Sequence, residues 1–194
     1  VDAGSTDGTR QVVEQQLFPP HSEKERGSDD DDVVVKIVDY ADGGGRGPAL
    51  NAGVAASCGS LLLFLHADTL VPKGYDDAIR QALRQPHVEI TAFGFRTSSR
   101  HGLVSRALEA CVNLRSRALQ LPWGDQGLAM TRSRFHALDG GFKPIPVFED
   151  LDMVVRARSR GVYRGRFIKT LDLDVETSAR RYAALYAFVV SNLL

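Results

Sequence analysis

At residues 61–69 the chain reads Leu-Leu-Leu-Phe-Leu-His-Ala-Asp-Thr, a continuous apolar run that ends in a histidine and an aspartate. The run is long enough for a strand buried on both faces and far too short to span a bilayer. An imidazole or a carboxylate at the end of so buried a strand is costly to place without a partner or ligand. We therefore predict a core strand that delivers His66 and Asp68 to a functional site.

Strand-like and helix-like segments alternate on both sides of this run. Helical patterns are expected at 10–18, 48–58, 72–84, 102–121, 133–138 and from 149 onward, and strand patterns at 33–38, 61–65, 89–96 and through Met130. Such alternation predicts an α/β fold with a mainly parallel sheet and a ligand site beyond the carboxyl ends of its strands. The length of 194 residues and a hydrophobic content of 43% favour one domain over 1–194.

Composition excludes several classes of function. The 24 basic and 24 acidic side chains cancel, so no global field draws the chain to nucleic acid or anionic lipid. Cys58 and Cys111 lack metal-ligand spacing, which argues against zinc and predicts buried thiols in a reducing compartment. Residues 21–32 carry four consecutive aspartates and are expected to form a disordered acidic loop without the interleaved spacing of a calcium site.

The first nine residues, Val-Asp-Ala-Gly-Ser-Thr-Asp-Gly-Thr, have the composition of a strand end, a tight loop and a helix start. Glycines there let the backbone approach a flat ligand such as a nucleotide base and ribose. The alternative is a plain turn with a helix cap. That alternative explains Asp7 but leaves Asp2 without a role, so Asp2 is predicted to contact the ligand and Asp7 to serve mainly the turn.

Two further motifs suit an anionic ligand, and each has a plain structural alternative. The glycine-rich stretch 43–48 lacks the ending of a triphosphate loop, but it places Arg46 just before a helix N-terminus, where charge and free N–H groups meet. Asp68 could ligate a manganese or magnesium ion that bridges diphosphate oxygens. With equal weight, Asp68 or Thr69 could cap the helix near Pro72.

Near the end of the chain, Glu149 and Asp150 open a predicted helix whose dipole favours a charged carboxylate, as a general base requires. Acids also stand at helix N-termini for stability alone. Asp152 and Arg156 have the spacing of an exposed ion pair. The run Arg180-Arg181-Tyr182 could clamp a diphosphate or an acceptor, or could simply form a solvated basic face. Residues 182–194 are apolar but too short to span a bilayer, and association with a membrane through them stays open.

In this order the motifs resemble inverting glycosyltransferase family 2, with a GT-A fold, and are most similar to its subgroup associated with radical-SAM and selenodomain proteins. The resemblance rests on residues 1–9, 45–53, 61–69, 124–126, 140–142, 149–150 and 178–182. It implies a Rossmann-like three-layer sandwich. The family begins with a hydrophobic strand that does not precede Val1 here, so we expect an N-terminally truncated domain with its first strand missing.

The resemblance implies a role for each motif. Asp150 would be the base, with Glu149 beside it, and Asp68 and His66 would hold Mn2+ or Mg2+, His66 replacing the first aspartate of an Asp-x-Asp motif. The implied donor-binding residues are Asp2, Ser5, Asp7, Arg46, Asn51, Asp68, Arg180 and Arg181. The implied acceptor side comprises Trp123, Gly124, Asp125 and Gln126.

The implied reaction moves a sugar from a nucleotide-diphosphate donor, expected to be a UDP-sugar, to a hydroxyl acceptor in one in-line displacement. Of two alternative functions, the first stays open and the second is excluded by the sequence. A degenerate, non-catalytic binding module would keep the fold without turnover. A sugar nucleotidyltransferase needs an N-terminal triphosphate loop with a lysine, which the sequence lacks. The expected location is the cytoplasm or the cytoplasmic face of a membrane.

Overall fold

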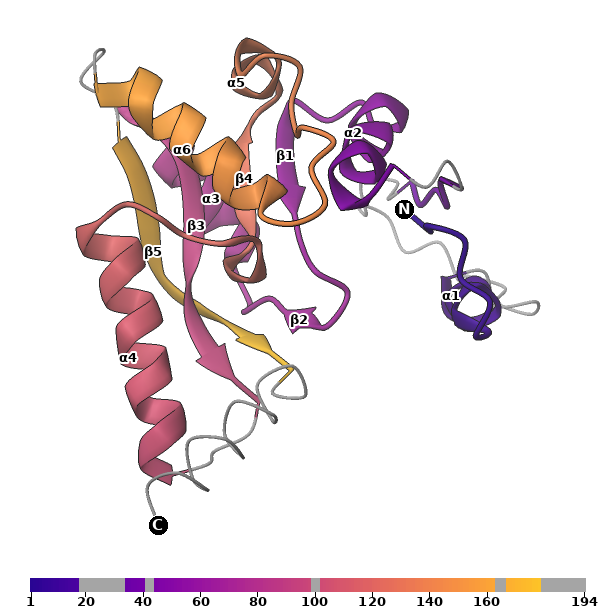
Figure 1. Ribbon diagram of the computed structural model, residues 1–194, viewed down its shortest axis with the longest axis horizontal. Coiled ribbons are helices and arrows are strands. Elements are labelled where there is room, and N and C mark those ends of the chain that lie inside the picture. Colours follow the sequence, from indigo (N-terminus) through magenta and orange to yellow (C-terminus); the bar gives the residue numbers. More distant parts are fainter. Residues whose placement is uncertain (18–33, 41–43, 99–101, 163–166, 179–194) are drawn as a thin grey trace, which may run out of the picture.

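A five-stranded mixed sheet lies at the centre of the computed structural model, which describes residues 1–17, 34–40, 44–98, 102–162 and 167–178 (Figure 1). Its strands, in the spatial order β1-β4-β3-β5-β2, are β1 (Leu61–Phe64), β4 (Leu128–Thr131), β3 (Val88–Thr97), β5 (Phe167–Thr177) and β2 (Thr69–Leu70). The β3–β5 pairing is parallel, and the other three pairings are antiparallel.

The predicted α/β class is confirmed, whereas the sheet is mixed rather than mainly parallel. Strands β1 and β3 both run antiparallel to β4, so they share one direction with each other and with β5. This shared direction agrees with the predicted alternation, but β1 and β3 are not neighbours, because β4 lies between them. The alternating pattern could not show that β4, a later strand, inserts between them, because strand composition carries no information on the direction of pairing.

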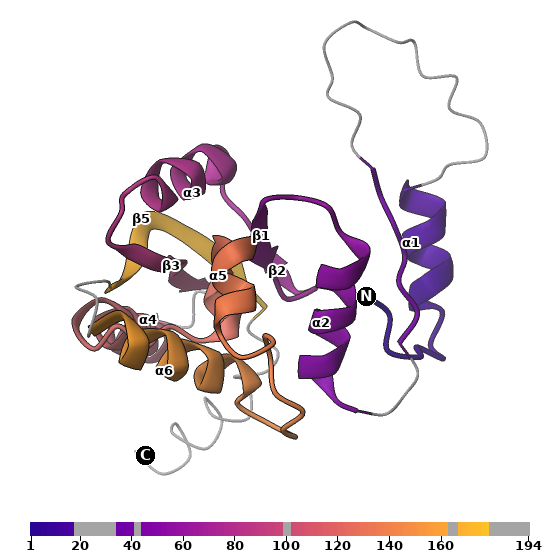
Figure 2. The same ribbon diagram turned by 90° about the horizontal axis from the view of Figure 1, so that it is seen from above.

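Six α-helices are present among the described residues, with bounds close to the predicted ones. They are α1 (Thr9–Leu17), α2 (Arg46–Ala56), α3 (Tyr75–Leu83), α4 (Gly102–Ala118), α5 (Arg132–Ala137) and α6 (Glu149–Val162), with a 3-10 turn, η1, at Gly124–Gln126. Figure 2 shows α3 on one face of the sheet and α5 and α6 on the other, with α2 beside β1. This is the layered α/β arrangement that the sequence predicted. Helix α1 lies beyond α2, away from the sheet (Figure 1).

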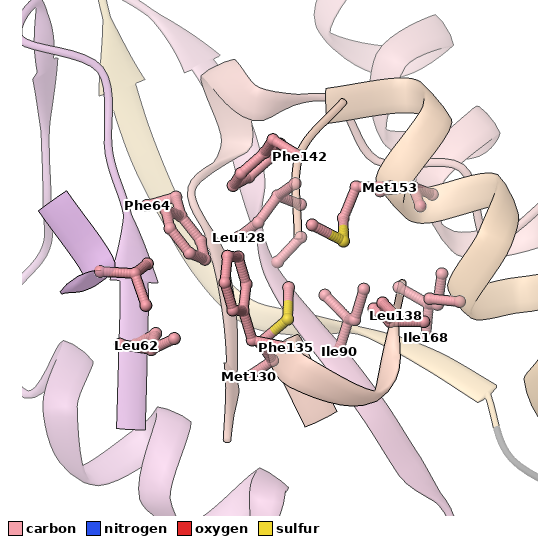
Figure 3. Close-up of a cluster of buried hydrophobic side chains, with 14 residues drawn as sticks. Leu62, Phe64, Ile90, Leu128, Met130, Phe135, Leu138, Phe142, Met153 and Ile168 are labelled. Atoms are coloured by element: carbon pink, nitrogen blue, oxygen red, sulfur yellow. The ribbon is translucent and has the colours of Figure 1, made fainter. Parts of the chain in front are cut away.

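Two apolar clusters bind these layers together. The larger one joins α2, α5 and α6 to the sheet, and Figure 3 shows its side chains converging from β1, β4 and α6. The ring of Phe64 meets Phe142 edge-on at 4.8 Å and stacks on Phe135 at 5.6 Å. The smaller cluster joins Ile79 and Ala82 of α3 to the opposite face. Since β1 contributes to both clusters, its apolar run is explained by contacts on both faces.

Side chains of α4 take the place of a strand along the far part of β3, beyond the short β4. The side-chain amide of Asn113 accepts the N–H of Phe95 at 2.8 Å and donates to its carbonyl at 3.0 Å. The carboxylate of Glu109 accepts the N–H of Thr97 at 2.9 Å. These bonds satisfy backbone groups that a sheet edge would otherwise leave open.

The predicted strand at 33–38 is wrong for its described residues, 34–38. Only an isolated parallel bridge joins Asp2 to Asp39, made by the N–H of Asp2 to Val38 O and the N–H of Tyr40 to Asp2 O, both 2.8 Å. A strand needs a ladder of partners, and the described chain offers it this single pairing. Conversely, β5 was not predicted, although Leu171, Leu173 and Val175 alternate with acids.

Three other expectations concern the surface. Cys58 and Cys111 are both exposed, so their predicted burial is wrong: Cys58 follows the end of α2, and Cys111 lies on an outward-facing position of α4. No helix among the described residues is long and apolar enough to cross a bilayer. The acidic loop 21–32 and the apolar segment 182–194 lie outside the described residues.

Candidate active site

A cavity of about 830 Å3 opens beyond the carboxyl end of β1, next to the first turns of α2 and α6. This volume is in the usual range for small-molecule sites. Five of the residues predicted from the sequence line it together, namely Arg46, His66, Asp68, Gly124 and Asp150. The rest of its wall is mostly apolar and comprises Val1, Ala3, Tyr40, Gly45, Ala49, Leu50, Phe64, Leu65, Ala67, Leu128 and Phe142.

Two glycines allow the N-terminus of α2 to meet that of α6. Gly45 has a φ of 85°, a conformation that favours glycine, and it stands directly before the helix. A Cβ on Gly47 would lie 2.5 Å from the carbonyl oxygen of Lys143 and 3.4 Å from the Cβ of Glu149. The close approach brings the Arg46 guanidinium onto two carboxylates: its Nε bonds Glu149, and its Nη2 lies 3.5 Å from Asp150 Oδ2.

Asp150 is held at the cavity wall by donors alone. The N–H of Gly124 donates to its Oδ2 at 2.6 Å, and the N–H of Leu151 donates to its Oδ1 at 2.8 Å. The residue is 9% exposed and stands in the first turn of α6, where the helix dipole favours negative charge. Every partner of this carboxylate is a donor or a cation, so its oxygens are fixed in place while one edge faces the cavity.

Gly124 separates Asp150 from the imidazole of His66. A Cβ at this position would lie 2.6 Å from Asp150 Oδ2 and 2.9 Å from His66 Nε2. Both polar groups therefore lie within about 3 Å of one point, and any side chain there would displace them. Gly124, predicted on the acceptor side, lies directly against the predicted base in the structure.

Glu149 lies behind Arg46 instead of at the surface of the cavity. The residue is 2% exposed, does not line the cavity and pairs with the Arg46 guanidinium. These contacts favour a positioning role for Glu149, in place of the catalytic role that its sequence motif indicated.

The loop that carries His66 and Asp68 is fastened to the end of β5. The two-residue strand β2 pairs Thr69 with Thr177, and the N–H of Ser178 donates to Asp68 O at 3.0 Å. The helix-cap alternative for Asp68 or Thr69 is wrong, because Gly74 occupies the cap position of α3 and no side chain caps it. With this alternative excluded, the two candidate metal ligands, His66 and Asp68, are found together among the residues that line the cavity.

The donor set fits a cation only if a ligand completes it. Among the described residues, no three His, Cys, Asp or Glu side chains gather as a metal site. One imidazole and one carboxylate would hold two coordination positions, and divalent cations that bind nucleotides usually take the others from phosphate oxygens and water. His66 and Asp68 thus fit an ion shared with a diphosphate.

Two residues of the opening motif line the cavity, but its predicted ligand-binding residues do not. Val1 and Ala3 line it together with Tyr40, whereas Asp2, Ser5 and Asp7 do not. The hydroxyl and the N–H of Ser5 both donate to Asp2 Oδ1, at 2.5 and 3.1 Å, and they lower the pKa of Asp2 below its ordinary value.

Asp7 serves the turn into α1, as the sequence analysis favoured. Its Oδ1 accepts the Thr9 hydroxyl at 2.6 Å and the Thr9 N–H at 3.1 Å, and these bonds lower the pKa of Asp7. Neither bond reaches toward the cavity, so the contacts favour a structural role over a ligand-binding one.

Two other predicted binding residues use their side-chain amides within the protein. Asn51 pairs with the backbone of Phe142 in both directions, at 2.8 and 3.0 Å. Gln126 is fully buried, accepts the Ser116 hydroxyl at 2.6 Å and donates to Phe93 O at 2.9 Å. Both are therefore supports of the site.

The remaining acceptor-side residues divide between the interior and the surface. Asp125 is buried and does not line the cavity. Trp123 is partly exposed, with its ring 4.0 Å from the Arg115 guanidinium and 6.3 Å from the ring of Phe148. Phe148 was not predicted, since an aromatic residue beside two acids belongs to no hydrophobic period. Arg180 and Arg181 lie outside the described residues.

Comparison with known proteins gives one family and one fold. The sequence model of the family described as Glycosyl transferase family 2 matches residues 1–109. No curated protein sequence matches the chain. The structure is similar to a mannosyltransferase of Pyrobaculum calidifontis, solved in complex with GDP-Man and Mn2+, with a TM-score of 0.68 at 19% identity. That match covers 94% of this chain and 47% of the mannosyltransferase, so the chain spans about half of its length.

Proposed function

The chain belongs to glycosyl transferase family 2, and from this premise we propose that it transfers a sugar from a nucleoside diphosphate donor to a hydroxyl acceptor, with inversion at the anomeric carbon. The observation that carries the proposal is the position of Asp150. Its carboxylate is fixed by the N–H groups of Gly124 and Leu151 and borders a cavity that also holds Arg46, His66 and Asp68. This transfer needs a base that takes the acceptor proton and a positive charge that stabilises the leaving diphosphate, and one cavity offers both.

We assign the two ends of the donor to the two ends of the cavity. The nucleoside would lie against Val1, Ala3 and Tyr40, with the Asp2 carboxylate within reach of the ribose. The diphosphate would lie near Arg46, which keeps guanidinium N–H groups free for phosphate because an arginine has five donors. The mannosyltransferase of similar fold binds GDP-Man, so GDP-sugars join UDP-sugars as candidate donors.

His66 and Asp68 would hold a divalent cation against the diphosphate, and the similar mannosyltransferase was solved with Mn2+. Such an ion would neutralise charge on the departing diphosphate. The histidine in place of a first aspartate also supports the narrower proposal that the chain belongs with the transferases associated with radical-SAM and selenodomain proteins. Arg180 and Arg181 follow Ser178, whose N–H bonds Asp68, and we propose them as further diphosphate ligands.

In the proposed reaction, the acceptor hydroxyl donates its hydrogen bond to Asp150. As its oxygen attacks the anomeric carbon, the bond from that carbon to the diphosphate oxygen breaks on the opposite side, and Asp150 takes the hydroxyl proton. The negative charge that leaves with the diphosphate is stabilised by Arg46. Glu149 acts through Arg46, because it is buried behind the guanidinium.

The base assignment is tested by Asp150→Asn in the full chain. Removal of a general base lowers turnover by about 100- to 10,000-fold. The amide nitrogen of asparagine has to face an N–H donor or Arg46, so the variant itself should unfold at a lower temperature. The increase in unfolding temperature produced by UDP- or GDP-sugars with Mn2+ should stay within a few degrees of that of the wild type, because the proposed nucleoside end of the cavity is unchanged. Asp76→Asn is the matched control, because Asp76 also stands in the first turn of a helix but is exposed on α3. Wild-type turnover in Asp150→Asn would contradict the assignment.

The same assay separates the enzyme from a non-catalytic binding module. An inverting transferase gives a product of opposite anomeric configuration to the donor, which proton NMR reads directly. A binding module would be stabilised by the donor and would give neither transfer nor hydrolysis. Absence of any shift with every nucleotide sugar would contradict both functions.

A further inference from the structure

An exposed aromatic pair lies close in the chain to two residues of the cavity wall, since Trp123 directly precedes Gly124 and Phe148 stands two residues before Asp150. Trp123 is 37% exposed and Phe148 is 56% exposed, with ring centroids 6.3 Å apart and planes inclined by 61°. Neither ring lines the cavity, although Gly124 and Asp150, their near neighbours in sequence, do. The pair is therefore close in the chain to the predicted base Asp150, but its rings lie outside the proposed donor cavity.

Trp123 is held rigidly in this position. One face of its ring lies 4.0 Å from the Arg115 guanidinium, and its backbone N–H donates to Gln126 Oε1 at 3.3 Å. The Gln126 side chain is itself anchored by Ser116 and Phe93. An exposed ring with so many supports has little freedom to lose when a ligand binds.

Phe148 is an unfavourable residue for its backbone position. It has a φ of 64°, in the left-handed region that β-carbon-bearing residues avoid, and it directly precedes α6, where its carbonyl accepts the N–H of Asp152. Helices favour Ser, Thr, Asp, Asn or Gly at such a position. Since the ring is more than half exposed, burial does not compensate for this conformation. A residue that costs stability without a packing gain points to function.

We propose that Trp123 and Phe148 form the acceptor platform and that the acceptor is a sugar, bound with the C–H face of its ring on the aromatic pair and a hydroxyl directed to Asp150. This inference rests on the proposed function and names the acceptor class for it. A pyranose has an apolar face the size of one aromatic ring and hydroxyls at its edge, which match an aromatic pair beside a carboxylate and a guanidinium.

Trp123 is the single tryptophan of the chain, so tryptophan fluorescence reports on this platform alone. Titration of the full chain, with Mn2+ and UDP or GDP present, should give a saturable change with methyl pyranosides or disaccharides and none with n-octanol. Phe148→Ala should weaken sugar binding by about tenfold or more, because one aromatic contact is lost. Phe148→Trp keeps an aromatic ring, so its KM for the sugar acceptor in a turnover assay should be close to that of the wild type and lower than that of Phe148→Ala.

Phe148→Gly distinguishes a binding role from a structural one. Glycine relieves the left-handed backbone, so this variant should unfold at a higher temperature than the wild type and still bind sugar at least about tenfold more weakly. If Phe148 had only a structural role, its replacement by glycine would lower the unfolding temperature and the sugar affinity together. Leu114→Ala removes an apolar side chain of α4 that is also more than half exposed, and it should change neither sugar binding nor the donor-induced temperature shift.

The two proposals fail in different ways. If nucleotide sugars raise the unfolding temperature but Phe148→Ala binds sugars as tightly as the wild type, the acceptor platform is wrong and the transferase function stands. A fluorescence change with n-octanol but not with sugars likewise overturns the sugar acceptor. If no nucleotide sugar binds, the proposed function itself fails.

Discussion

At the scale of single residues, hydrogen bonds from Ser5 lower the pKa of Asp2. The Ser5 hydroxyl and N–H hold the pKa of Asp2 below the ordinary value of 3.8, because both donate to the charged carboxylate. A lowered folded pKa contributes stability above the ordinary pKa, and this contribution is lost as the pH falls through the folded value. The effect of Ser5 is therefore confined to acidic pH, since an aspartate with the ordinary pKa of 3.8 is already ionised in the neutral range.

Ser5→Ala should raise the pKa of Asp2 toward 3.8, because the largest of the lowering contacts is lost. Carboxyl-carbon NMR titration of the two proteins measures the change. Asp7 is the internal control, since its pKa is lowered by Thr9 and should not move. An unchanged Asp2 titration in the variant would show that the Ser5 hydroxyl does not set this pKa.

The sequence identified the residues of the candidate site better than their roles. Arg46, His66, Asp68 and Asp150 were predicted and line one cavity, because each lies at a strand end or a helix start, where ligand sites of α/β sheets form. Asn51 and Gln126 were predicted to bind ligands and instead use their side-chain amides within the protein. Their hydrogen-bond partners lie far away in the sequence, so a local motif could not show this use.

At the scale of elements, the contact between α2 and α6 determines where Arg46 meets Asp150. Gly47→Ala would place a methyl group 2.5 Å from the carbonyl oxygen of Lys143, a backbone atom that cannot turn aside. We expect a loss of about 1–3 kcal/mol in the free energy of unfolding and a smaller donor-induced temperature shift. Urea unfolding and thermal shift with nucleotide sugars measure the two effects.

Gly53→Ala is the control within the same helix. There the new methyl group meets Val1 Cγ2 at 2.8 Å, which is a side-chain atom of an exposed residue and not a backbone atom. The helix preference for alanine should dominate and stabilise the protein by up to about 1 kcal/mol. If Gly47→Ala and Gly53→Ala had equal free energies of unfolding, steric contact with Lys143 would not be the reason that position 47 requires glycine.

Helices were easier to predict from the sequence than strand pairing. All six helices were expected near their observed positions, because the 3.6-residue period and the flanking Pro and Gly residues are local features. The direction of β4 is not a local feature, because it is defined by pairing with β1 and β3, which lie far earlier in the sequence. The segment 34–38 shows the converse, since a β-branched run forms no strand where a partner ladder is lacking.

At the scale of the whole molecule, Arg132 joins the α2 layer to the sheet. Its guanidinium donates to the carbonyls of Val54, Ser57 and Gly59, all near the end of α2, while its own backbone leaves β4. Arg132→Met should lower the free energy of unfolding by about 2 kcal/mol, because carbonyls bonded to a charged group lose their donor.

Urea denaturation of the Arg132→Met chain checks this prediction through its midpoint, with an unchanged slope. Arg158→Met, an exposed arginine of α6, is the matched control and should stay within about 0.5 kcal/mol of the wild type. A midpoint for Arg132→Met equal to that of the control would mean that solvent replaces these hydrogen bonds at no cost.

The spatial order of the strands leaves β1 at one edge of the sheet, with β4 as its only strand partner among the described residues. Its sequence, Leu-Leu-Leu-Phe, contains no charged residue and no proline, two features that keep many edge strands from pairing with other chains. Two other protections are present: the strand is only four residues long, and α2 lies beside it (Figure 2). The run that builds the core therefore depends on its short length and on a neighbouring helix to avoid pairing with other chains.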